Sequence, residues 1–103
     1  MSTSKEYIEF VCGQLQGCGE IRYRKMFGEY MVYLNGKPAL LVCDDTVFAP
    51  IHESIAPLMH NAGRGKPYDG AKERYILDID NRELVLEVME RLEPHLKLRK
   101  HKK

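Results

Sequence analysis

The sequence contains no tryptophan and only three cysteines among its 103 residues. Cys12, Cys18 and Cys43 are too few, and odd in number, for the disulfide framework of a small secreted protein. No apolar run approaches the roughly 20 residues that a membrane-spanning helix needs. The N-terminal stretch MSTSKEYIEF also lacks the apolar core of a secretory signal peptide. We therefore expect a cytoplasmic protein that folds without disulfide bonds.

Metal and nucleotide motifs are missing as well. The histidines show no metal-binding spacing with one another or with the cysteines; they are His52, His60, His95 and His101. The glycine-rich stretch 63–66 follows a predicted helix instead of a strand, which is the wrong order for a phosphate-binding loop. Cys12 and Cys43 fall within apolar patterns and should be buried, whereas Cys18 lies between two glycines in a loop. The sequence thus predicts no metal, no cofactor and no catalytic residue, and favours a non-enzymatic protein.

The charge is uneven along the chain, although the net charge is only +1. Five basic residues and no acid follow Pro94: Lys97, Arg99, Lys100, Lys102 and Lys103. The other 11 basic residues face all 15 acids, so residues 1–94 carry about −4. We expect one domain over residues 1–94 and a basic, disordered tail over 95–103. Contact between this tail and nucleic acid is the functional alternative.

Hydrophobic periodicity predicts an α+β domain with the order α-β-β-β-α-β-α. The three helices are expected from about Ser4 to Gln16, with Thr3 as N-cap, over 54–61, and from an Asp80 N-cap to Pro94. An antiparallel meander of four to five strands is expected over 20–26, 29–34, 38–43, 46–49 and 74–79. Asn35-Gly36 predicts a type I′ hairpin turn, and Phe27-Gly28 predicts a bulge.

The central strands are apolar on both faces. Tyr30 and Val32 alternate with Met31 and Tyr33, which are also apolar or aromatic. An exposed sheet face normally carries polar side chains. The second face is therefore predicted to be covered, either by a helix, so that the sheet has helices on both faces, or by a second copy of the chain in a homodimer.

A basic strand is the clearest candidate for binding. Arg22, Arg24 and Lys25 interleave with Tyr23, as in sheets that bind single-stranded nucleic acid by charge pairing and stacking. Alternation, however, places Arg22 and Arg24 on the face opposite Tyr23. The plainer interpretation is a core-facing Tyr23 with solvated arginines that pair with nearby acids such as Glu20 or Glu29.

Two motifs resemble those of a known family. The first is RKMFGEYMVYLNGK, residues 24–37, followed by VCDD at 42–45; the second is KPYDGAK at 66–72. Together they resemble the TfoX N-terminal domain family of bacterial competence regulators, over roughly residues 7–92. The resemblance implies an α+β domain of a cytoplasmic bacterial protein related to transcription regulation. Full-length regulators of this family carry a second, helical domain, to which the resemblance does not extend, and the family supplies no catalytic residues to carry over.

The function expected from the sequence is a non-enzymatic regulatory or adaptor domain that acts through protein–protein contacts. The candidate partner- or ligand-binding residues are those of the two motifs: Arg22, Arg24, Lys25, Phe27, Gly28, Glu29, Tyr30, Lys66, Pro67, Tyr68, Gly70 and Lys72. One alternative is a weak nucleic-acid-associated module that uses Arg22, Arg24, Lys25 and the tail. A second is a small-ligand binder or enzyme of unknown reaction at residues 68–72. A protein partner is expected, a homodimer is considered, and no membrane association is expected.

Overall fold

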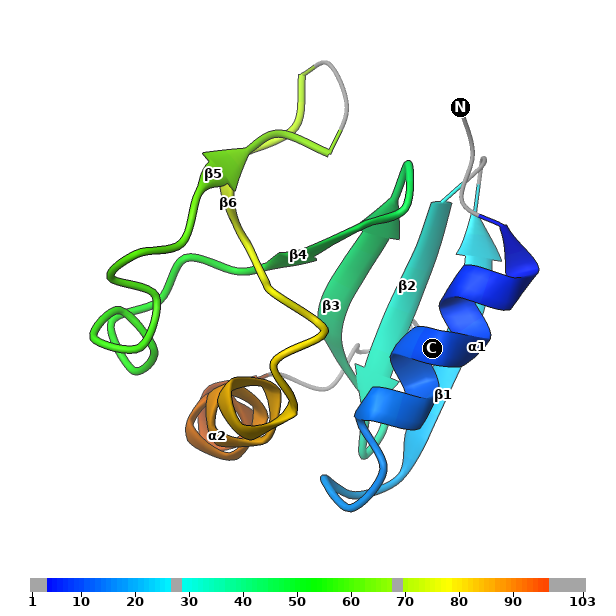
Figure 1. Cartoon of the computed structure of the whole chain (residues 1–103), viewed down its shortest axis with the longest axis horizontal. Helices are drawn as coiled ribbons and strands as arrows, with labels where there is room; N and C mark the ends of the chain where they lie inside the picture. Colours follow the sequence, from blue (N-terminus) through cyan, green and yellow to red (C-terminus); the bar gives the residue numbers. More distant parts are fainter. Residues whose placement is uncertain (1–3, 27–28, 68–69, 97–103) are drawn as a thin grey trace, which may run out of the picture.

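A computed structural model describes residues 4–26, 29–67 and 70–96. Over these residues the chain forms two α-helices and six strands (Figure 1). The elements are α1 (Lys5–Gln14), β1 (Ile21–Met26), β2 (Glu29–Leu34), β3 (Lys37–Cys43), β4 (Thr46–Ala49), β5 (Arg64–Gly65), β6 (Arg74–Ile76) and α2 (Arg82–Leu92), followed by a 3₁₀ turn, η1 (Glu93–His95). The sheet order is β1-β2-β3-β4-β6-β5, and every neighbouring pair is antiparallel. Neither described helix is long and apolar enough to cross a membrane.

The predicted order of elements is wrong in the second half of the chain. Residues 53–61 form successive turns instead of the predicted helix, so the described chain has two α-helices and not three. Of the six backbone hydrogen bonds in this segment, from Ile55 N–H to His52 onward, five join residues three apart, as in a 3₁₀ turn. Pro57 lies in the middle and supplies no N–H. Residues 64–65, which lie outside every predicted strand, form β5.

The two helices begin with side-chain caps, each one residue after the predicted position. Ser4 caps α1, because its Oγ accepts a hydrogen bond from the Tyr7 N–H at 3.1 Å. Asn81, and not Asp80, caps α2 by accepting from the Leu84 N–H at 3.2 Å. Thr3, the predicted cap of α1, lies outside the described residues.

Tight turns fix the register of the meander. Asn35 and Gly36 have φ of 53° and 82°, the positive values that a type I′ turn requires, so this predicted hairpin is confirmed. Asp44 and Asp45 both have φ of 54° and reverse the chain between β3 and β4 in the same way. The described bulge falls between Val32 and Tyr33 against β3. The predicted bulge at Phe27-Gly28 lies outside the described residues.

Both helices pack on the same face of the sheet. A single hydrophobic cluster joins Ile8, Val11 and Leu15 of α1 with Val85, Val88, Met89 and Leu92 of α2. The same cluster holds the alternate strand residues Tyr30, Val32, Leu34, Leu40, Val42, Val47 and Ala49. Ile55 and Met59, from the turns at 53–61, are also buried in it. The prediction of helices on both faces is therefore wrong.

The second sheet face carries a row of apolar side chains that differ in exposure. The strand register places Met31, Leu41, Phe48 and Ile76 in one row across this face. Leu41 and Phe48 are buried, whereas Ile76 is exposed. Gly65 lies so close that a Cβ there would be 3.6 Å from the Phe48 ring. β5, and not a third helix, thus packs beside Phe48 on this face.

Candidate functional site

The two sequence motifs meet at one end of the sheet. β2 begins at Glu29 in the first motif, and β3 ends at Cys43, which the β2–β3 register places beside Glu29. The Cys43 thiol donates a hydrogen bond to the carbonyl oxygen of Pro67 in the second motif at 3.2 Å. Segments 24 residues apart in sequence are therefore in direct contact. We call the described residues around this contact, Glu29, Cys43, Asp44, Lys66 and Pro67, the motif junction.

The electrostatics of the motif junction keep its thiol protonated. Burial raises the pKa of Cys43, and the neighbouring carboxylates of Glu29 and Asp44 raise it further. A protonated thiol suits a hydrogen-bond donor and does not suit a nucleophile, which must ionise near neutral pH. Burial likewise raises the pKa of Cys12 and Cys18. All three cysteines are partly exposed, so the prediction that Cys12 and Cys43 are buried is wrong.

The remaining residues of the two motifs fall into three groups. Lys66, Gly70 and Lys72 are exposed, and Gly70 has the positive φ of 86° that its turn requires. Tyr30 is only 5% exposed and belongs to the core, where its ring packs edge-on against Tyr23 at 5.5 Å. Phe27, Gly28 and Tyr68 lie outside the described residues. Tyr30 therefore supports the fold and offers no surface to a partner.

The basic strand β1 lies at the edge of the sheet, with its charges on both faces. Arg22 and Arg24 pair with Tyr33 and Met31 and share the second face, whereas Tyr23 and Lys25 are on the helix side. The Arg22 guanidinium donates two hydrogen bonds to Glu20, the nearer nitrogen at 2.9 Å. Tyr23 is 39% exposed and the arginines do not share its face. The described geometry therefore provides no common stacking and charged surface for nucleic acid.

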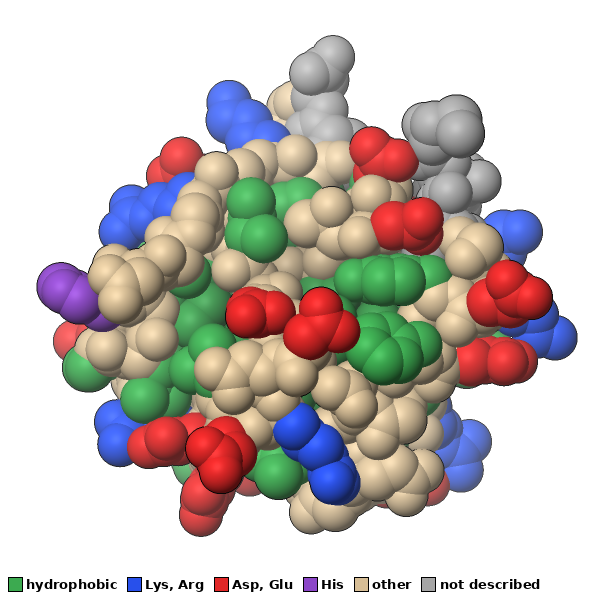
Figure 2. All heavy atoms as spheres, in the orientation of Figure 1, with side chains coloured by type: hydrophobic (Ala, Val, Ile, Leu, Met, Phe, Trp, Pro, Cys, Tyr) green, Lys and Arg blue, Asp and Glu red, His purple; other side chains and the backbone are tan. Residues whose placement is uncertain are grey.

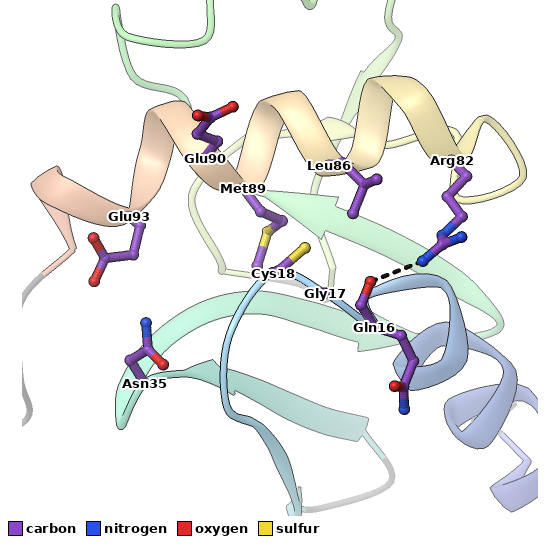
Figure 3. Close-up of a pocket in the computed structure, with 9 residues that line it drawn as sticks. All are labelled: Gln16, Gly17, Cys18, Asn35, Arg82, Leu86, Met89, Glu90 and Glu93. Atoms are coloured by element: carbon purple, nitrogen blue, oxygen red, sulfur yellow. Dashed lines mark hydrogen bonds between the residues drawn. The ribbon is translucent and has the colours of Figure 1, made fainter.

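A groove that the sequence did not indicate lies at the other end of the sheet. Figure 3 shows it between α2 and the loop that joins α1 to β1. Its volume is about 600 Å³, and its lining includes Gln16, Cys18, Asn35, Arg82 and Glu90. Arg82 lies toward one end of α2 and Glu90 toward the other, with Cys18 between them (Figure 3). The signal in the sequence was the helical spacing of Arg82, Leu86, Met89 and Glu93, which places them on one side of α2.

Polar contacts within the chain occupy much of this groove. The Arg82 guanidinium donates to the Gln16 carbonyl at 2.8 Å and so ties the loop to α2. Glu93 pairs with Lys37, and the hydrogen bond from Lys37 holds the pKa of the Glu93 carboxyl below its usual range. These contacts join the ends of β3 and α2. We therefore interpret the groove mainly as a structural junction.

Acidic side chains are spread over the face seen in Figure 2, and most Lys and Arg side chains lie toward its outline. This matches the charge of about −4 on residues 1–94.

The predicted nucleic-acid residues of the tail, Lys97, Arg99, Lys100, Lys102 and Lys103, lie outside the described part of the chain. Among the residues that the structure describes, no group of three or more His, Cys, Asp or Glu side chains is placed to hold a metal ion.

Comparison with known proteins points to one family. The profile of the TfoX N-terminal domain family matches residues 13–92. A curated protein of Spirochaeta aurantia, described as an uncharacterized 12.7 kDa protein in the trpE 5′ region, is 31% identical over 78 residues. The aligned part covers 76% of this chain and 68% of that protein. No solved structure matches significantly. The match over residues 13–92 contains both motifs, and the chain belongs to the TfoX N-terminal domain family.

Proposed function

We propose that this competence-related regulatory domain acts by binding another protein at the motif junction, without catalysis. The observation that carries the proposal is the contact between Cys43 and Pro67, which brings the two motifs to one end of the sheet. A contact of this kind fixes the position of the exposed residues on either side of it. Asp44 and Lys66 flank it, and both are exposed.

The properties of the junction support recognition more than chemistry. It combines acidic side chains on the β2 and β3 ends with the cationic Lys66 on the loop after β5. Charged side chains on exposed loops, held by a rigid sheet, are a common arrangement for specific protein contacts. The raised pKa of the Cys43 thiol removes the group that would otherwise be the natural nucleophile there.

Reversing a single exposed charge tests the proposal. Lys66→Glu changes the junction, and Glu87→Lys, on the exposed side of α2, is the matched control. Both variants should keep wild-type stability in urea, because exposed substitutions of this kind usually change stability by less than about 0.5 kcal/mol. Transcripts of competence genes are then measured in the native host when each variant replaces the wild-type protein.

The proposal predicts that Lys66→Glu impairs regulation and that Glu87→Lys does not. Equal regulation by the two variants, or a larger loss with Glu87→Lys, would contradict it. A folded Lys66→Glu protein that regulates normally would show that the junction is not the contact surface.

A further inference from the structure

We propose that the free edge of β1 docks an extended acidic segment of the partner protein, which adds a seventh strand to the sheet. This inference rests on the proposed function, since it names the chemistry of the partner and the surface that holds it. β1 and β5 are the two edges of the sheet. β5 has only two residues, whereas β1 has six, so β1 is the edge long enough to pair with another strand.

The ladder shows which backbone groups of β1 face outward. The Asn35 N–H donates to the Glu20 carbonyl at 2.8 Å, so these residues form a hydrogen-bonded pair. Such pairs alternate along an antiparallel ladder, and the β1–β2 register therefore directs the backbone groups of Arg22 and Arg24 toward β2. The N–H and C=O groups of Ile21, Tyr23 and Lys25 point away from the sheet. No hydrogen bond between described residues uses these six groups.

The exposed side chains of β1 select the charge of the partner. Arg22, Tyr23, Arg24 and Lys25 are all exposed, on a domain whose residues 1–94 carry about −4. Arg22 contacts Glu20, but both side chains are more than half exposed, so this pair is weak and can be exchanged. Arg24 and Lys25 form no ion pair with a described residue. Three cations within four residues attract an acidic strand.

The same charges argue against two other occupants. A second copy of β1 in antiparallel pairing would bring Arg22, Arg24 and Lys25 close to the same cations, which is unfavourable. A nucleic acid would satisfy the charges, but its backbone cannot pair with the alternating N–H and C=O groups of Ile21, Tyr23 and Lys25. An extended peptide satisfies both requirements.

The register specifies the pattern of the added strand. Arg22 and Arg24 are on one face and Lys25 on the other, with Tyr23 beside Lys25. An antiparallel partner therefore needs two acids opposite Lys25 and Arg24, an apolar residue opposite Tyr23, and an acid opposite Arg22. β1 ends at Met26, just before the motif junction begins at Glu29, so one bound strand could lead from the edge to the junction.

A synthetic eight-residue peptide with the central pattern Glu-Glu-Val-Glu is the probe, and its Lys-Lys-Val-Lys counterpart is the control peptide. Backbone amide exchange on the whole, unmodified protein is followed by NMR. We expect the acidic peptide to protect the amides of Ile21, Tyr23 and Lys25 from exchange, because these are the outward-facing donors. The lysine peptide should leave them unchanged. Absence of protection at these three positions, with saturating acidic peptide, would overturn the inference.

Two variants at position 25 distinguish the contribution of the backbone N–H to peptide binding from that of the side-chain charge. Lys25→Ala removes the cation and keeps the N–H, whereas Lys25→Pro removes both and places a ring on the outer edge. Because the Lys25 N–H points away from β2, proline there leaves the β1–β2 hydrogen bonds intact. Fluorescence anisotropy should show that Lys25→Pro binds the acidic peptide about tenfold more weakly than Lys25→Ala. Equal affinities would contradict strand addition, and Tyr23→Pro against Tyr23→Ala repeats the comparison if Lys25→Pro does not fold.

A single-stranded oligonucleotide of matched charge is the third probe. Tighter binding of the oligonucleotide than of the acidic peptide would overturn the inference in favour of nucleic acid. Failure of the peptide tests, with the Lys66→Glu defect in regulation intact, would reject the β1 edge and leave the proposed function standing. Peptide binding at β1 without any effect of Lys66→Glu in cells would reject the motif junction instead.

Discussion

Gly19→Ala should be the most damaging single-methyl change in the described chain, because Gly19 lies against the β2–β3 turn. Gly19 has φ of +145°, a conformation that L side chains rarely adopt. A Cβ added there would lie 2.8 Å from Oδ1 and 3.0 Å from Nδ2 of Asn35, and 3.1 Å from Leu34 Cδ1. Asn35 cannot move away freely, since its Oδ1 accepts a hydrogen bond from the Glu20 N–H at 2.9 Å.

The expected cost follows from these contacts. Backbone strain of this kind costs about 1–3 kcal/mol. Displacing the Asn35 side chain adds the loss of its hydrogen bond, about 1 kcal/mol. The free energy of unfolding should therefore fall by about 2–4 kcal/mol, which for a domain of this size lowers Tm by on the order of 10–25 °C.

Gly13→Ala is the matched control. Gly13 lies in α1, and a Cβ there would meet nothing within 4 Å. Alanine is the better helix former, so this variant should be up to about 1 kcal/mol more stable than the wild type. Urea unfolding followed by circular dichroism measures both variants, with unchanged m-values as the test of a common mechanism. Wild-type stability of Gly19→Ala, or equal destabilisation by the two substitutions, would refute the reasoning.

Four further predictions follow from the structure and the sequence. Glu93→Gln should destabilise the domain at neutral pH, because the hydrogen bond from Lys37 stabilises the ionised carboxylate and so lowers the pKa of Glu93. The difference from the wild type should disappear as the pH falls below about 4.3, where the carboxylate becomes protonated. A difference in urea midpoint between variant and wild type that does not change with pH would contradict this. Alkylation of the thiols by iodoacetamide at pH 7.5 should be slower than that of free cysteine, since burial raises their pKa values; a thiol that reacts faster would mark an activated nucleophile. The homodimer stays a prediction, and a strictly monomeric mass by light scattering across micromolar concentrations would reject it. Weak nucleic-acid binding stays a prediction too: truncation after Pro94 should flatten a log–log salt slope of up to about −4, and no binding at low salt would reject it.

Local turn chemistry predicted the meander well. Asn35-Gly36 is a short-range signal, since residues that tolerate positive φ are few, and this turn occurs where expected. The meander strands β2, β3 and β4 lie within one residue of their predicted bounds. Here the local preference and the global fold agree.

The second half depends on contacts that no local pattern reveals. The predicted strand 74–79 ends at Ile76, although the Leu77 N–H still donates to the Val47 carbonyl at 2.9 Å. Ile55 and Met59 of the predicted helix are buried, but the backbone between them forms successive turns around Pro57. Apolar periodicity thus indicated which side chains face the core and not which backbone conformation carries them.

The sequence predicted the two motifs of the candidate site but not the contact between them. Nothing in the sequence pairs Cys43 with Pro67, since that contact depends on where the loop after β5 runs in the folded chain. Tyr30 was a candidate only through its place in the first motif, and the structure assigns it to the core. The alternation of β1 correctly separated Tyr23 from the arginines.

Site-specific crosslinking in the native host tests the central claim most directly. A photo-crosslinking amino acid replaces Lys66 at the motif junction or, as the control, Glu87 on α2; both side chains are exposed. If the domain works by binding a protein at the junction, irradiation should yield a discrete protein adduct from position 66 and none from position 87. The same adducts from both positions, or an adduct from position 87 alone, would contradict the account.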